Sequence, residues 1–80
     1  MKAQIKKIIK DLVGDEIPDF SVEVSDNPTH GDYSTNVALL LAKKIKKNPV
    51  ETANYLKSLI ISDLFIKIEV AGPGFINFFV

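Results

Sequence analysis

Two alternating segments joined by a glycine-proline turn lie at the C-terminal end of the chain, and they restrict the fold more than any other feature. The first covers residues 64–70, the second covers residues 75–80, and Gly72-Pro73-Gly74 lies between them. Alternation of apolar and polar residues is typical of strands that bury one face, and glycine with proline marks a turn. We therefore expect an antiparallel hairpin, and the chain must contain at least a small sheet.

Three other segments have the apolar spacing of helices. The first ends at Gly14, a common helix stop, and its expected core side is formed by Ile5, Ile8, Ile9, Leu12 and Val13. The second, residues 37–47, is apolar almost all round and ends in lysines, so we expect it to be the most buried helix. The third has Asn48 as its N-cap and Pro49 at its first position, and is expected to end near Ile61. Its expected core residues are Val50, Ala53, Leu56 and Ile60.

Residues 19–25 alternate as well, with Phe20, Val22 and Val24 on one side, which predicts a half-buried strand. The order is then helix, strand, helix, helix, strand, strand. This order predicts an α+β fold, in which a small, mainly antiparallel sheet of three to four strands has about three helices packed on one face. Residues 1–80 are expected to be a single domain, because 80 residues with 46% apolar content supply one core and no second one.

The composition argues against several kinds of site. The chain has no Cys, and its one His cannot form a zinc site without several carboxylates, so we predict no metal and no cofactor. No apolar run reaches the length of a signal peptide or a membrane span, which favours a cytoplasmic protein without membrane contact. All ten basic residues are Lys and the formal net charge is zero, so any RNA contact should be loosely oriented and sensitive to salt.

The segment of residues 75–80 has two different faces, because side chains alternate along a strand. One face is formed by Ile76, Phe78 and Val80, and the other by Phe75, Asn77 and Phe79. We expect the first face to be buried, which leaves two rings and an amide uncovered. A base that stacks on a Phe ring gains roughly 1–3 kcal/mol, and an Asn amide offers both a donor and an acceptor. Gly74 would let another backbone approach. The alternative is that the rings pack on a neighbouring protein domain.

A second specific block, Pro28-Thr29-His30-Gly31-Asp32-Tyr33-Ser34-Thr35-Asn36, precedes the second helix. We expect a polar loop in which Asp32 or Ser34 caps that helix and Gly31 takes a conformation that a side chain would oppose. Contact with RNA or another domain is a second interpretation, because a helix N-terminus can bind phosphate. His30, Asp32 and Ser34 are also the residue types of a hydrolase triad, but triad members come from separate segments that converge in space. We therefore predict no catalytic residue.

Two groups of lysines can form local positive patches. The simpler interpretation is that both are solvated faces, and the other is that they contact phosphate. The first group is formed by Lys2, Lys6, Lys7 and Lys10, and the second by Lys43, Lys44, Lys46 and Lys47.

The two blocks, Pro28–Asn36 and Ala71-Gly72-Pro73-Gly74-Phe75-Ile76-Asn77-Phe78, are separated by two lysine-rich helical patterns. In this order and spacing they resemble the N-terminal tRNA-contacting domain of arginyl-tRNA synthetases, and the resemblance covers nearly the whole chain. It implies an accessory domain that contacts the D-loop at the elbow of arginine tRNA and orients the tRNA for a separate catalytic domain. The H-I-G-H and K-M-S-K-S signatures of that family's nucleotide site are absent. The chain itself is thus expected to be no enzyme, but a fragment, an excised domain or a free-standing relative.

The resemblance also implies roles for individual residues. Phe75 and Asn77 match the aromatic residue and the Asn that contact a D-loop base, and the block before the second helix is expected to be mainly architectural. The predicted tRNA-binding residues are Phe75, Asn77, Phe79, Gly74, Lys43, Lys44, Lys46 and Lys47. The predicted structural residues are His30, Gly31, Asp32, Tyr33, Ser34 and Asn36, with Tyr33 and Asn36 tying the loop to the sheet or to a neighbouring domain. The rival function is an interdomain docking module without nucleic-acid contact.

Overall fold

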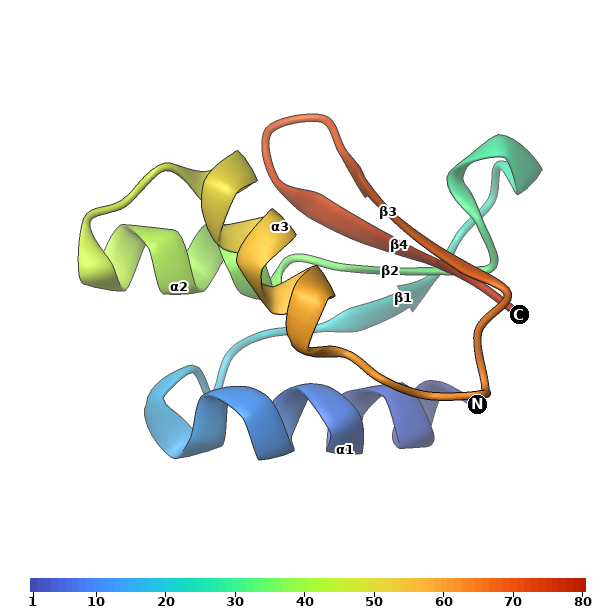
Figure 1. Ribbon diagram of the computed structural model, residues 1–80, viewed down its shortest axis with the longest axis horizontal. Coiled ribbons are helices and arrows are strands. Elements are labelled where there is room, and N and C mark those ends of the chain that lie inside the picture. Colours follow the sequence, from blue (N-terminus) through green and yellow to red (C-terminus); the bar gives the residue numbers. More distant parts are fainter.

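Three helices and four strands make up the fold (Figure 1). The computed structural model describes residues 1–80, apart from the side chain of Pro28. None of the described helices is long and apolar enough to span a membrane. The helices are α1 (Lys2–Val13), α2 (Val37–Ile45) and α3 (Pro49–Leu59), and the strands are β1 (Val22–Val24), β2 (Tyr33–Thr35), β3 (Lys67–Ala71) and β4 (Phe75–Phe79). The predicted α+β class is confirmed. The structure adds β2, a short strand in the segment that was expected to be a loop.

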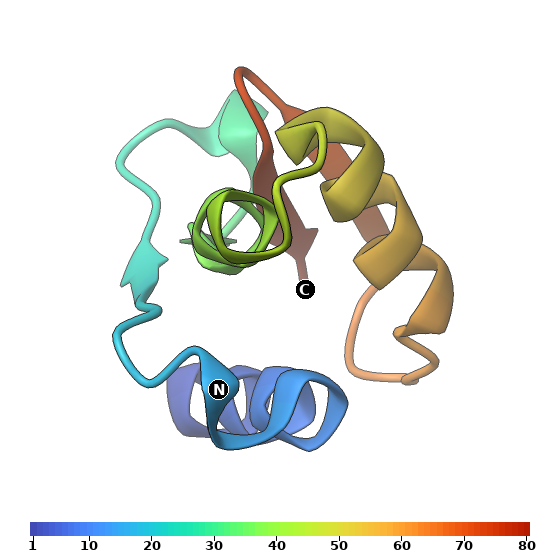
Figure 2. The same ribbon diagram turned by 90° about the vertical axis from the view of Figure 1, so that its left-hand side faces the viewer.

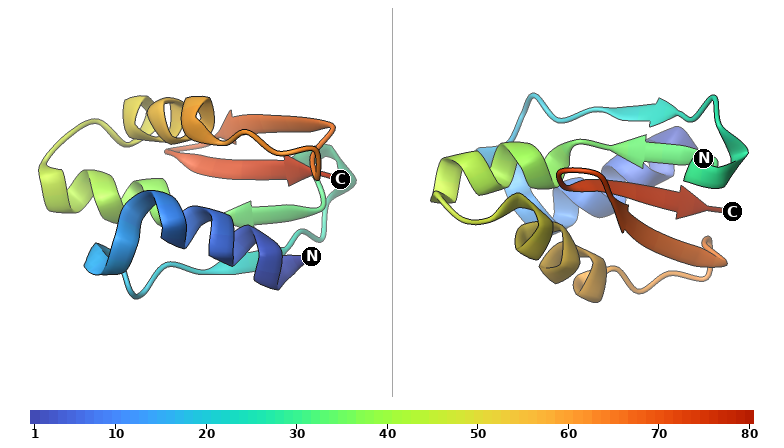
Figure 3. Two further views of the ribbon diagram at one scale, coloured as in Figure 1. Left: turned by 60° about the horizontal axis from the view of Figure 1, so that its bottom comes forward. Right: turned by 90° about the horizontal axis from the view of Figure 1, so that it is seen from above.

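The strands form one antiparallel sheet in the order β1-β2-β4-β3. The predicted C-terminal hairpin is present as β3 and β4, with Lys67 opposite Phe79 at one end and Ala71 opposite Phe75 at the other. One face of the sheet is turned toward the helices, as Figure 2 shows from the end of the molecule. The opposite face is open, and the right-hand view of Figure 3 looks onto it with α1 behind the strands. An antiparallel sheet can keep one solvated face in this way.

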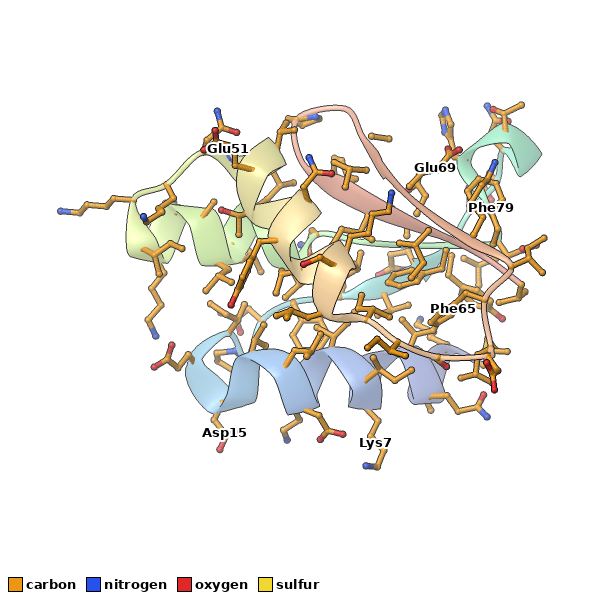
Figure 4. The ribbon with its side chains drawn as sticks, viewed as in Figure 1. Lys7, Asp15, Glu51, Phe65, Glu69 and Phe79 are labelled. Atoms are coloured by element: carbon orange, nitrogen blue, oxygen red, sulfur yellow. The ribbon has the colours of Figure 1, made fainter. Side chains whose placement is uncertain are left out.

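The core lies between the sheet and the helices. Ile76 and Phe78 of β4 are fully buried, as are Ile5 and nearly all of Ile9 on α1. The ring of Phe65 packs on that of Phe78 with centroids 4.9 Å apart, and Figure 4 shows Phe65 on the α1 side of the strands. Two of the three residues expected on the buried side of the last strand are therefore in the core. The third, Val80, lies beyond the end of β4 and is 44% exposed.

Some expected core positions are wrong, and each has a local reason. Val50 is exposed, and Thr52 is buried in its place because its hydroxyl donates to the Asn48 carbonyl oxygen at 2.8 Å. Leu12 and Val24 are also exposed; Val24 ends the three-residue edge strand β1, which is much shorter than the predicted strand over residues 19–25. α2 ends at Ile45, earlier than expected, since Lys46 takes a left-handed backbone conformation with φ 58°.

The start of α3 has the capping geometry that the sequence predicts. The Asn48 side-chain oxygen accepts hydrogen bonds from the backbone N–H groups of Val50 at 2.9 Å and Glu51 at 3.1 Å. We expect Asn48→Ala to lower the free energy of unfolding by about 1 kcal/mol, because two amides of the first turn lose their acceptor. Urea unfolding of the 80-residue chain measures this loss. Asn48→Asp, which puts a carboxylate oxygen where the amide oxygen accepts, is the control and should lose much less.

Candidate nucleic-acid interface

A row of polar side chains crosses the open face of the sheet. The strand register places Glu23, Ser34, Asn77 and Glu69 side by side across β1, β2, β4 and β3. Paired residues of antiparallel strands point to the same face, and neighbours along a strand point to opposite faces. Phe75, Asn77 and Phe79 therefore lie on the face opposite Ile76 and Phe78, in agreement with the alternation of the sequence.

A hollow of about 470 Å³ opens on this face between the two hairpins. It brings together residues of the two specific sequence blocks, which lie far apart in the chain. The β1–β2 side supplies Ser25, His30 and Ser34, and the β3–β4 side supplies Ala71, Gly72, Pro73, Phe75 and Asn77. The hollow is thus formed by both blocks, with a ring and an amide from the second facing a hydroxyl and an imidazole from the first.

Asn77 lies recessed in this hollow. It is only 5% exposed, so the expectation that its amide is uncovered is wrong; β4 is an inner strand, and its neighbours β2 and β3 cover the side chain. Its amide takes part in none of the side-chain hydrogen bonds among the described residues, yet no buried side-chain nitrogen or oxygen in this part of the chain lacks a partner. The amide atoms therefore keep a narrow contact with solvent. A ligand atom that reaches them would find an unused donor and an unused acceptor.

Phe75 is the more accessible ring of this face, with 38% of its surface exposed. It follows directly on the Gly72-Pro73-Gly74 turn, which is braced by α3. A Cβ atom at Gly74 would come within 2.9 Å of the Pro49 Cβ, so Gly74 is buried against the first residue of that helix. The missing side chain at Gly74 serves this internal contact, and it fixes the turn from which Phe75 projects.

Phe79 is less available than Phe75. The Lys67 Nζ lies 4.3 Å from the centroid of its ring, and the same Nζ lies 2.9 Å from the Glu69 Oε1. On the Gly31 side, a Cβ atom at that glycine would lie only 3.3 Å from the Phe79 Cδ1. Figure 4 shows Glu69 and Phe79 on the side of the sheet away from α1.

Gly31 and Asp32 join the first block to β4. Gly31 has φ +83°, and a Cβ atom there would lie 2.7 Å from the Phe78 carbonyl oxygen, which confirms that a side chain is opposed at this position. The backbone N–H of Asp32 donates to that same oxygen at 2.8 Å. The Asp32 carboxylate accepts from the backbone N–H of Val80 at 2.8 Å. The prediction that Asp32 caps α2 is therefore wrong, because its carboxylate is engaged at the end of β4.

The cap of α2 comes from a residue that the sequence reasoning missed. The Thr35 hydroxyl accepts from the Val37 backbone N–H at 3.3 Å and donates to the Ser21 carbonyl oxygen at 2.7 Å. Ser34 does not cap the helix, since it lies in β2 and lines the hollow. Asn36 accepts from the Ser21 backbone N–H at 2.9 Å and so ties the block to the segment before β1. A Thr two residues before a helix was the available signal.

Tyr33 and His30 occupy different surroundings. Tyr33 is half-buried in β2, where it pairs with Val24 and Phe78, so it belongs to the sheet itself. His30 is exposed in the short turn Pro28–His30 and lines the hollow.

The lysine groups lie outside the hollow. The second group is exposed at the end of α2, and the structure places none of its members among the residues that line the hollow. Lys44 donates to the Glu16 carbonyl oxygen at 3.1 Å. In the first group, Lys7 pairs with Asp11 at 3.4 Å and Lys10 with Asp15 at 3.7 Å. Figure 4 shows Lys7 pointing away from the sheet, on the far side of α1.

Together these features define a small α+β domain that presents one open face of an antiparallel sheet. The chain belongs to the family of arginyl-tRNA synthetase N-terminal domains, whose family model matches residues 1–80. The arginine–tRNA ligase of Thermotoga maritima is 46% identical over 80 residues, which cover 99% of this chain and 14% of the ligase. That of Staphylococcus carnosus is 44% identical over 69 residues, which cover 84% of this chain and 12% of the ligase.

Two solved structures have the same fold. The arginyl-tRNA synthetase of Plasmodium falciparum superposes with a TM-score of 0.82 at 24% identity, over 99% of this chain and 16% of that one. The Thermus thermophilus enzyme superposes with a TM-score of 0.73 at 26% identity, over 100% of this chain and 14% of that one. The chain spans 12–16% of the length of these relatives. It corresponds to their N-terminal domain and not to their catalytic part.

Proposed function

We propose that this domain binds the elbow of arginine tRNA through the hollow on its open sheet face, contacts one base of the D-loop there, and orients the tRNA for aminoacylation by a separate catalytic domain. The observation that carries the proposal is that one hollow is lined both by an accessible ring, Phe75, and by an amide, Asn77, that has no hydrogen-bond partner among the described residues. Family membership and the names of the relatives, which are arginine–tRNA ligases, support arginine tRNA as the RNA.

The geometry favours a base that is unpaired. Asn77 is recessed, so only a base swung out of its stack can reach the amide with its polar edge while lying on the ring of Phe75. Bases in loops meet this requirement, and bases in a duplex do not. The brace between Gly74 and Pro49 holds Phe75 in place before the RNA arrives, which lowers the cost of ordering the site on binding.

Electrostatics adds little affinity inside the hollow. Glu23 and Glu69 flank Ser34 and Asn77 in the same row, so the polar row itself does not attract phosphate. Phosphate contacts must then come from the margins. Lys47 lies two residues before Pro49, against which the hairpin turn packs, and Lys46 precedes it, so these two have the shortest chain path to the hollow in the second lysine group. Lys43 and Lys44 lie further back on α2. We expect weak binding by the isolated domain.

We expect Phe75→Ala to weaken binding of an arginine tRNA transcript to the 80-residue chain by about 5- to 150-fold, since base stacking contributes roughly 1–3 kcal/mol. We expect Asn77→Ala to weaken it by about 2- to 12-fold, since a hydrogen bond contributes about 0.5–1.5 kcal/mol. Fluorescence anisotropy at low salt measures the affinity. Val24→Ala is the matched control, because Val24 is 65% exposed but points to the other face of the sheet.

Two other results would overturn the proposal. If both variants bind as the parent chain does while replacement of Lys46 and Lys47 abolishes binding, only non-specific electrostatics remains. If no variant changes tRNA binding, the open face is available for a protein domain, as the interdomain docking function requires.

A further inference from the structure

Lys67 lies on the open face of the sheet and contacts two side chains there. It is the one basic residue in the four strands. Its Nζ lies 4.3 Å from the Phe79 ring centroid and 2.9 Å from the Glu69 Oε1, and its side chain is still 53% exposed. A cation over an aromatic ring is attracted to the ring face. The ammonium therefore has an aromatic ring and a carboxylate as neighbours on this face.

The two contacts of the Lys67 ammonium leave part of the side chain open to solvent. An ammonium group has three N–H donors, and Glu69 is the ion-pair partner of Lys67 among the described residues. The ring of Phe79 supports the cation without accepting a hydrogen bond of ordinary strength. Since half of the side chain is exposed, at least one donor of Lys67 points to solvent on the face that carries the hollow.

Phe79 cannot offer the same surface to a base that Phe75 offers. One side of its ring is taken by Lys67, and its edge lies against Gly31. A base that stacked on Phe79 would have to displace the ammonium and break the contact with Glu69. Phe75 has no such cover and is 38% exposed. The two rings of this face thus have different roles.

We propose that Lys67 binds a phosphate of the RNA strand whose base occupies the hollow, and that Phe79 is a positioning residue that holds Lys67 rather than a base. This inference rests on the proposed function. Lys67 lies opposite Phe79, two residues along β4 from Asn77, which is about 7 Å along the strand. The sugar and phosphate of one nucleotide can bridge such a distance. Glu69 offsets part of the positive charge, so the contact adds direction more than long-range attraction.

The test is the salt dependence of binding between the 80-residue chain and an arginine tRNA transcript. We expect Lys67→Met to weaken binding about 3- to 10-fold at low salt and to reduce the slope of log K against log salt by about 0.7–0.9, the loss of one phosphate contact. Lys57→Met is the control for the change in net charge, because Lys57 is exposed on α3. Phe75→Ala should weaken binding and leave the slope unchanged.

Phe79 is tested through Lys67. Phe79→Leu should reduce the slope of log K against log salt as Lys67→Met does. Phe79→Tyr should keep the slope of the parent chain, because a ring remains under the cation. The double variant of Lys67→Met with Phe79→Leu should reduce the slope no more than either single variant. Thermal unfolding of each variant shows whether the fold is kept.

The outcomes separate this inference from the function on which it rests. An unchanged slope for Lys67→Met would overturn the phosphate contact. A loss for Phe79→Leu with an unchanged slope, equal to that of Phe75→Ala, would show that Phe79 stacks a base. If Phe75→Ala and Asn77→Ala leave the affinity for tRNA unchanged, the proposed base contact is wrong. A reduced slope for Lys67→Met would in that case support the phosphate contact without the base contact.

Discussion

Phe78→Ala is expected to remove about 3–5 kcal/mol of stability, a large share of the total. Phe78 is fully buried on the inner strand β4 and packs on Phe65 with ring centroids 4.9 Å apart. Truncation of a buried Phe loses the transfer free energy of the ring and leaves a cavity that the structure fills only in part. A domain of 80 residues has a total stability of roughly 4–12 kcal/mol. Urea unfolding followed by circular dichroism measures the loss.

Phe75→Ala is the matched control, because it makes the same substitution three residues earlier on the same strand. Phe75 is 38% exposed on the open face, so we expect its truncation to cost less than half as much as that of Phe78. Equal losses for the two variants would contradict the assignment of one buried and one open face to β4.

The hairpin and its two faces could be predicted because the information is local. A period of two residues on both sides of Gly72-Pro73-Gly74 specifies two strands and their turn, and the alternation then assigns each side chain to a face. Once Ala71 is known to pair with Phe75, the register also places Glu69 beside Asn77 and Lys67 beside Phe79. The orientation of Phe75 and Asn77 therefore followed from the sequence alone.

The recess of Asn77 could not be predicted in the same way. It depends on β4 being an inner strand, and β4 is inner because β2 pairs with its free edge. β2 has only three residues, Tyr33–Thr35, and although Tyr and Thr favour strands, three residues are too few to show an alternation. Its pairing with β1 on one side and β4 on the other is what forms it.

The residue that caps α2 and the contact of Lys67 with Phe79 could not be predicted from the sequence either. Three residues before α2 have side chains that can cap it, namely Asp32, Ser34 and Thr35. Only the folded chain shows that the Asp32 carboxylate accepts from the Val80 N–H and that Ser34 lines the hollow. Thr35 is left, and it caps the helix. The contact between Lys67 and Phe79 depends on side-chain conformations, which alternation along a strand does not specify.

Gly31→Ala is expected to destabilise the chain by about 2–5 kcal/mol, the second of the two largest effects. The position has φ +83°, which costs an L-residue roughly 1–2 kcal/mol. An added Cβ would also lie 2.7 Å from the Phe78 carbonyl oxygen. That oxygen is backbone of an inner strand and accepts the Asp32 N–H, so it cannot move aside without weakening the end of β4. Overpacking of this kind adds about 1–3 kcal/mol.

Gly14→Ala separates the two causes. Gly14 has φ +66° and ψ −149°, a conformation that essentially only glycine adopts, and nothing lies within 4 Å of the position of its Cβ. Gly14→Ala therefore shows the cost of an unfavourable backbone conformation without a clash, and a larger loss of urea midpoint for Gly31→Ala would identify the clash with Phe78. If Gly31→Ala loses no more than Gly14→Ala, the end of β4 moves to accept the added methyl group. Phe79 and its contact with Lys67 are then expected to move with it.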